Sequence, residues 1–212
     1  EEELTELRRE LDARPTAEAE AETAERRQKM QEASDRVELS EAETRSLIDG
    51  QLRRAGWMAD TDSMRWADGD RPEEGQSKAI AEVPVDGGHA DYLLFDGLTP
   101  VAVIEAKRWE RDVAGEVEQA KRYARTLDLE DLSADIEPPG GPWEHERDRY
   151  TIPFVFATNG RDFHHVLRNR RGVWFQDMRR PTNRSRPLGG WYTPDGLRRL
   201  LAWVIFLAIL FQ

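Results

Sequence analysis

A run of apolar residues ends in two charged side chains at "VAVIEAKRW", residues 101–109. The apolar residues predict a β-strand, whose side chains point alternately to its two faces. Glu105 and Lys107 therefore share one face of the expected strand with Val101 and Val103. A carboxylate and an ammonium placed in this way are either a solvated strand end or a pair of catalytic groups at the rim of a sheet.

A second carboxylate is expected beside this pair. Asp91 stands in "HADYLLF", residues 89–95, and the short connection at 97–100 folds that strand back alongside Glu105. Two carboxylates on neighbouring strands can bind Mg²⁺, which prefers oxygen ligands. A bound metal can lower the pKa of a water and stabilise charge on phosphate oxygens, and Lys107 can position the attacking water or neutralise the phosphate. The three residues thus indicate phosphodiester hydrolysis, although such a spacing by itself is common in charged chains.

The spacing of apolar residues changes after this strand. Between residues 112 and 127 they recur at helical intervals, at Val113, Val117, Ala120 and Ala124. Gln119 and Tyr123 are four residues apart and lie beside that stripe. They are either a polar helix edge or active-site residues that contact DNA or order the metal-binding carboxylates.

The remaining pattern predicts one α/β domain over residues 39–200. A helix is expected from a capping box at "SEAE", residues 40–43, to Gly56, with Ile48, Leu52 and Ala55 facing inward. Loops are expected at 60–76 and 133–149, and strands at 79–85, 89–95, 101–107, 151–158 and 172–176. With the helix at 112–127 and a last helix near the C-terminus, this order describes a mixed central β-sheet flanked by helices.

Two further segments flank the predicted domain. Residues 1–38 are nearly all charged residues and alanine, which predicts an N-terminal helical extension that is exposed or forms a weak coiled-coil spacer. The apolar run at 201–212 is too short to span a bilayer. It is expected to be a core helix or a remnant of a protease-cleavage site, and no membrane partner is expected.

Charge and composition narrow the function classes. The net charge is −11, with 8 Lys and Arg against 16 Asp and Glu in residues 1–50, but 10 Arg against 3 Asp in residues 151–212. The basic C-terminal third can therefore face a polyanion. The absence of cysteine excludes disulfides and Cys-based zinc sites, and the four histidines do not have zinc spacing. The chain contains no G-x-x-x-x-G-K-[ST] motif for ATP and does not open like a signal peptide, so a cytoplasmic location is expected.

The segments "ADYLLF", "LTPVAVIEAK" and "EQAKRYA" together resemble a known nuclease family. It is the nuclease domain of the R (restriction) subunit of type I restriction–modification enzymes, within the PD-(D/E)xK superfamily. The resemblance extends to "SEAETRSLIDGQLRRAGW", "IPFVFATNG" and "RRPTNRSRPLGGWYTPDGL", and so covers roughly residues 39–200. It implies a restriction-endonuclease-like fold and a Mg²⁺-dependent DNA endonuclease, in which Mn²⁺ is expected to substitute.

The resemblance also implies partners and site residues. The chain would be the nuclease part of a type I site-specific deoxyribonuclease that acts on double-stranded DNA with methylation and specificity subunits. ATP would act only through a motor domain that this chain does not contain. The residues that match the catalytic motifs are Asp91, Glu105, Lys107, Gln119 and Tyr123, with Asp91 and Glu105 also as metal ligands. Ala90 stands where the superfamily name has Pro, which changes backbone stiffness but not ligand chemistry.

Several charged residues have two interpretations each. Glu43 is either a third metal ligand or the capping partner of the first helix, and Arg45 is either a surface residue or a phosphate contact. The basic C-terminal residues are either DNA phosphate contacts or part of a solvated linker; they are Arg179, Arg180, Arg184 and Arg186.

Two other functions are compatible with the sequence. The chain could be another PD-(D/E)xK nuclease, either a repair exonuclease that requires DNA ends or a junction resolvase that prefers branched DNA. It could also be a non-catalytic DNA-binding or assembly module whose carboxylates bind no metal.

Overall fold

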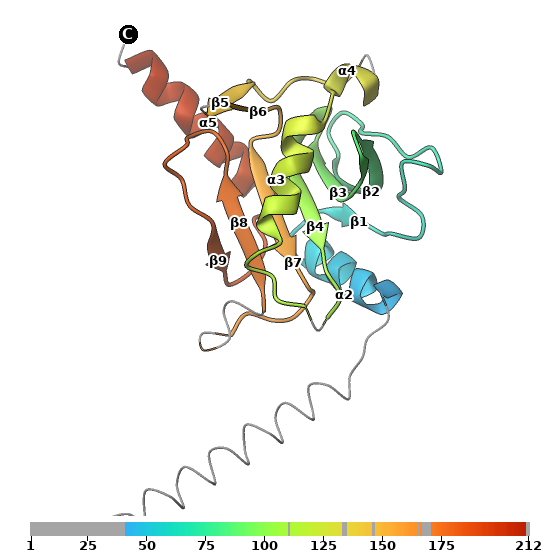
Figure 1. The fold of residues 1–212 in the computed structure, drawn as a ribbon. Coiled ribbons are helices and arrows are strands. Elements are labelled where there is room, and N and C mark those ends of the chain that lie inside the picture. Colours follow the sequence, from blue (N-terminus) through green and yellow to red (C-terminus); the bar gives the residue numbers. More distant parts are fainter. Residues whose placement is uncertain are drawn as a thin grey trace, which may run out of the picture. The chain divides into compact units, whose positions relative to one another are not determined.

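The computed structural model describes residues 41–109, 111–132, 135–145, 147–164, 166 and 171–210. They form a mixed β-sheet of seven strands with helices on both of its faces (Figure 1). This is the predicted α/β class, and it is consistent with a restriction-endonuclease-like fold. The expected extension at 1–38 and the expected helix cap at Ser40 lie outside the described residues.

The strand order in the sheet is β1-β2-β3-β4-β7-β8-β9. The strands are β1 (Met58–Ala59), β2 (Ser77–Val85), β3 (Gly88–Asp96), β4 (Thr99–Ala106), β7 (Phe154–Thr158), β8 (Val173–Asp177) and β9 (Arg186–Leu188). The pairs β1–β2 and β4–β7 are parallel, and the other neighbours are antiparallel. A separate two-stranded hairpin consists of β5 (Trp143–His145) and β6 (Asp148–Tyr150).

Each face of the sheet has its own hydrophobic core. Helix α3 (Val117–Thr126) covers one face, where the predicted stripe of Val113, Val117, Ala120 and Ala124 is buried. Helices α2 (Glu41–Arg54) and α5 (Pro194–Leu210) cover the other, and Ile48, Leu52 and Leu197 are fully buried there. Burial of each large aliphatic side chain contributes about 1.5–3 kcal/mol, which anchors α2 and α3 on opposite sides of β3 and β4.

Some predicted boundaries and segments are wrong. The helix expected at 112–127 begins at Val117, because the preceding residues, which include Gly115, form turns. The loop expected at 133–149 contains the hairpin β5–β6, in which the rings of His145 and Tyr150 lie 4.9 Å apart. The short elements β1, β9 and α4 (Leu129–Leu132) were not predicted from the sequence.

The predicted side-chain alternation along β4 fails at Val101. Leu94 pairs with Ala102 but Phe95 pairs with Pro100, so β4 contains an extra residue at this point. Such a bulge disrupts the alternation of side chains. Val101 consequently packs in the core with Ala102, whereas Val103 packs in the core on the α3 side.

The C-terminal helix begins earlier than expected. Helix α5 starts at Pro194, seven residues before the apolar run at 201–212. The side chains of residues 203–210, and residues 211–212, lie outside the described part, so the core-helix prediction stays untested there. None of the helices formed by the described residues has the length and apolarity needed to cross a membrane.

Candidate active site

The antiparallel pairing of β3 with β4 brings the two predicted metal-binding carboxylates together. Tyr92 pairs with Ile104, so the next residues outward along the two strands are Asp91 and Glu105. The backbone N–H of Ala106 donates to Asp91 Oδ2 at 2.8 Å, which fixes the Asp91 carboxylate at the carboxyl end of β4. The sequence prediction that the turn at 97–100 places Asp91 beside Glu105 is confirmed.

Glu105 is buried in a way that leaves one oxygen unsatisfied. The residue is 3% exposed, and its Oε1 lies 2.8 Å from Lys107 Nζ. Its Oε2 is buried and has no hydrogen-bond partner among the described residues. Burial, and then the nearby Asp91 carboxylate, raise the pKa of Glu105 to about 7, although Lys107 opposes this shift. A divalent cation between Asp91 and Glu105 would satisfy Oε2, so the pair is suited to a hard metal ion.

Lys107 connects this pair to helix α3. Its Nζ donates to Gln119 Oε1 at 2.9 Å, and Gln119 Nε2 donates to the Tyr123 hydroxyl at 2.9 Å. A third carboxylate, Glu116, lies 3.4 Å from Lys107 Nζ. Burial lowers the pKa of Lys107, but the carboxylates of Glu105 and Glu116 outweigh it, and the pKa is raised. The structure thus joins four of the predicted catalytic residues in one chain of contacts.

Arg45, on α2, contacts the Asp91 carboxylate. Its Nη2 is 3.0 Å from Asp91 Oδ1, and its Nη1 is 2.8 Å from Glu82 Oε1. Arg65 also lies 3.5 Å from Glu82. Arg45 is therefore not a free surface residue, because its guanidinium bridges two carboxylates.

Glu43 is exposed on α2. The described residues contain no group of three or more Asp, Glu, His or Cys side chains arranged to hold a metal ion. No such group joins Glu43 to Asp91 and Glu105, so its role as a third ligand stays a prediction.

Two charged residues that belong to the site were not predicted from the sequence. Glu82 lies in the apolar strand segment "AIAEVPV", where a single carboxylate inside a buried strand was the available signal. Glu116 lies one helical turn before Gln119, and the Gln119 N–H donates to its carbonyl at 3.0 Å. Its signal was weaker, because acidic residues are common at the start of helices.

Arg179 does not have the environment of a DNA contact. Its side chain is 2% exposed and forms two hydrogen bonds with Asp177, at 2.9 Å and 2.7 Å. Its remaining Nη1 donates to the backbone carbonyls of Leu200 and Leu201. The structure therefore argues against a phosphate contact by Arg179, because this buried guanidinium ties β8 to α5.

The other three basic residues of this segment are exposed: Arg180, Arg184 and Arg186. Arg186 lies on β9 and donates to the Tyr192 hydroxyl at 2.7 Å. Strand β9 is separated from β4 by β7 and β8, which places it about 14 Å from β4 at ordinary strand spacing. These residues do not join the carboxylate site, and their DNA-binding role stays a prediction.

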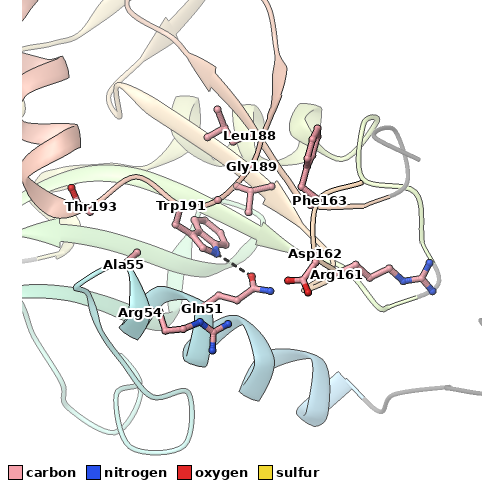
Figure 2. Close-up of a pocket in the computed structure, with 13 residues that line it drawn as sticks. Gln51, Arg54, Ala55, Arg161, Asp162, Phe163, Leu188, Gly189, Trp191 and Thr193 are labelled. Carbon is pink, nitrogen blue, oxygen red and sulfur yellow. Dashed lines mark hydrogen bonds between the residues drawn. The ribbon is translucent and has the colours of Figure 1, made fainter. Parts of the chain in front are cut away.

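A cavity of about 390 Å³ lies between α2, the residues that follow β7, and the residues that follow β9 (Figure 2). Trp191 Nε1 donates to Gln51 Oε1 at 3.1 Å, and Gln51 Nε2 donates to the Gly160 carbonyl at 2.7 Å. None of the residues predicted to act in catalysis lines this cavity. The candidate active site is therefore the carboxylate pair at the rim of the sheet rather than this hollow.

The raised pKa of Glu105 predicts how stability depends on pH without metal. A carboxyl group whose pKa is raised on folding stabilises the protein below its unfolded pKa, and this stability is lost as pH rises to the folded pKa. From about pH 4.5 to pH 7, Glu105 should lower the free energy of unfolding by up to about 3 kcal/mol. Urea unfolding in the presence of chelator measures this free energy at each pH. Between about pH 4.5 and pH 7, the free energy of unfolding should decline less in Glu105→Gln than in the wild type. The matched control is Glu118→Gln, at an exposed residue paired with Lys121; identical slopes for wild type and Glu105→Gln would contradict the assignment.

The burial of Arg179 predicts a stability effect. Arg179→Met removes the guanidinium from Asp177, which then keeps only the backbone N–H of residue 179 as a donor among these contacts. Breaking a buried pair in this way costs up to about 3–5 kcal/mol. Arg180→Met, at the exposed neighbouring residue, should change the free energy of unfolding by less than about 0.5 kcal/mol. Denaturant titration compares the two variants, and equal effects would show that Arg179 has no structural role.

Comparison with known proteins places this chain in a family. The family model described as "Type I restriction enzyme EcoKI endonuclease subunit second domain" matches residues 58–201, which is more than half of the chain. The chain is also similar to the type I restriction enzyme EcoKI endonuclease subunit of Escherichia coli (strain K12), with 39% identity over 186 residues. That alignment covers 78% of this chain but only 16% of the relative.

No solved structure matches the chain. The residues that the family model matches nevertheless include Asp91, Glu105, Lys107, Gln119 and Tyr123. The chain therefore belongs to the family of the second domain of the type I restriction enzyme EcoKI endonuclease subunit.

Proposed function

We propose that this chain is a Mg²⁺-dependent DNA endonuclease domain of the PD-(D/E)xK type, acting within a type I restriction enzyme. The observation that carries the proposal is the convergence of Asp91, Glu105 and Lys107 at one sheet rim, with an unsatisfied buried oxygen on Glu105. Membership of a restriction endonuclease subunit family supports the same conclusion.

Asp91 and Glu105 would hold the metal ion. Mg²⁺ is commonly bound by one or two carboxylates together with substrate phosphate and water, so two protein ligands are enough. When bound, the metal would stabilise charge on the phosphate oxygens and lower the pKa of a coordinated water. Mn²⁺ is expected to substitute, because it accepts the same oxygen ligands.

Lys107 would position the attacking water or neutralise the charge of the phosphate. It is held by Glu105 and Gln119, so its ammonium has little freedom to leave the site. Because Tyr123 accepts a hydrogen bond from Gln119, its own hydroxyl hydrogen can donate to a phosphate oxygen. Gln119 would thus set the positions of both groups that face the DNA.

The chain spans about 16% of the relative it matches, so most functions of a complete enzyme would lie in other segments or subunits. We propose that ATP acts through a motor outside this chain, and that methylation and specificity subunits select the double-stranded DNA. Phosphate contacts position a protein on DNA without reading its sequence. The isolated chain should therefore cut weakly and at scattered positions.

Cleavage of circular plasmid tests the proposed activity. The purified chain should nick plasmid with Mg²⁺ or Mn²⁺ in the absence of ATP. Asp91→Ala or Glu105→Ala should reduce nicking at least about a hundredfold, because removing a group that stabilises the transition state costs several kcal/mol. Lys107→Ala should lose nicking but retain Mn²⁺ binding.

Asp96→Asn is the matched control for Asp91, because Asp96 lies on the same strand and also pairs with an arginine, Arg198. It should cut at the wild-type rate. Wild-type nicking by Asp91→Ala would rule out the proposed site. Discrete fragments or a strict ATP requirement would show that the chain acts in another way.

Salt dependence tests the predicted basic surface. Log affinity falls as log salt rises when side chains contact phosphates. If Arg180, Arg184 and Arg186 make such contacts, their joint replacement by Gln should make this negative slope shallower by roughly 0.9 for each lost contact. Fluorescence anisotropy with a duplex oligonucleotide measures this slope. An unchanged slope would leave the solvated-linker interpretation.

A further inference from the structure

Glu82 has an unusual backbone conformation for a residue inside a strand. Its φ is +54°, and among the described residues it is the one non-glycine residue with a positive φ. This region is disfavoured for residues with a Cβ, and such strain is kept only where the surrounding structure enforces it. The strain therefore indicates that neighbouring residues hold Glu82 in this conformation.

The strained residue lies level with Asp91. On β2 and β3, Ala81 pairs with Tyr92 and Val83 pairs with Ala90, so Glu82 stands between these pairs opposite Asp91. In a regular strand, side chains two residues apart share a face.

This alternation of side chains is interrupted at Glu82 on β2 and at Asp91 on β3. Ala81 and Tyr92 pack in the α2-side core, whereas Val83 and Ala90 pack in the α3-side core. The left-handed backbone at Glu82 thus coincides with a reversal of both strands' alternation at the carboxylate site.

Arg45 connects the two residues at this point. Its two terminal nitrogens contact Glu82 Oε1 at 2.8 Å and Asp91 Oδ1 at 3.0 Å. The side chains of Arg45 and Asp91 are 16% and 18% exposed, so little water competes with the Arg45–Asp91 contact. The Glu82 side chain is 32% exposed, so its contact with Arg45 is partly open to water. A guanidinium held by one carboxylate presents its second nitrogen in a fixed direction, because the group is planar and rigid.

We propose that Glu82 is a positioning residue for phosphodiester cleavage, which holds Arg45 so that Arg45 fixes the carboxylate of Asp91. This inference rests on the proposed nuclease function. Arg45 and the Ala106 N–H then hold the two oxygens of Asp91 from two directions. The carboxylate keeps further lone pairs for a cation, and its orientation relative to Glu105 is set before metal and DNA bind.

Glu82 acts through Arg45 and not as a metal ligand. The described residues contain no three-carboxylate metal cluster, and Glu82 is already engaged by Arg45 and by Arg65 at 3.5 Å. A direct ligand and a positioning residue would behave differently when Arg45 is removed, and this difference is the basis of the test.

The experiment is a double-mutant cycle on plasmid nicking with the full chain. Glu82→Gln should lower the nicking rate roughly ten- to a hundredfold, as small misplacements of catalytic groups do. It should also raise the Mg²⁺ concentration at which the rate is half-maximal. Arg45→Met should have a similar effect. The double variant should nick no more slowly than Arg45→Met, because the effects of substitutions at coupled residues are not additive.

Two controls separate positioning from simple stability. Glu118→Gln removes an exposed paired carboxylate and should leave nicking unchanged. Glu82→Gly should be at least as thermally stable as Glu82→Gln, because glycine adopts a positive φ without strain, yet it should cut as poorly. If Arg45→Met does not fold, Arg45→Lys replaces it in the cycle, because lysine keeps the charge but lacks the planar fork that bridges two carboxylates.

The outcomes are distinguishable. Wild-type nicking by Glu82→Gln would overturn the inference and leave the proposed function standing. Additive effects in the cycle would also overturn it, because Glu82 would then act without Arg45. A wild-type chain that neither cuts DNA nor binds Mn²⁺ would overturn the proposed function and the inference with it.

Discussion

The burial of Glu105 beside a second carboxylate, Asp91, is the electrostatic constraint on which this site depends. The β3–β4 pairing places Asp91 and Glu105 side by side, and Glu105 is almost fully buried. Such a pair is unfavourable unless cations compensate it. The structure supplies Lys107 beside Glu105 and Arg45 beside Asp91, and still leaves one oxygen of Glu105 unsatisfied. That incomplete compensation is what a divalent metal would complete.

The two compensating cations depend on opposite faces of the sheet. Arg45 comes from α2, which is anchored by Ile48 and Leu52, and Lys107 is held by Gln119 of α3, which is anchored by the stripe that includes Val117. The hydrophobic cores therefore do more than stabilise the fold, because they set the distance of each cation from the carboxylates. A shift of either helix would change the electrostatic balance of the site.

Sequence patterns predicted the parts of the site that depend on local periodicity. The strands containing Asp91 and Glu105, the helix with Gln119 and Tyr123, and the turn that joins the two strands all follow from alternation, helical spacing and Gly or Pro residues. The missed features are long-range. The bulge at Val101, the strained conformation of Glu82 and the burial of Arg179 arise from tertiary contacts that no local pattern encodes. The Arg179 prediction was drawn from local charge alone, which says nothing about burial.

The most direct test of the central claim is a calorimetric titration of the chain with Mn²⁺, because it measures metal binding without DNA or cleavage. The wild type should bind Mn²⁺ at one site, and Glu105→Gln should abolish that binding, while Asp96→Asn should leave it unchanged. Equal binding by the wild type and Glu105→Gln, or no binding by the wild type, would contradict a metal site between Asp91 and Glu105.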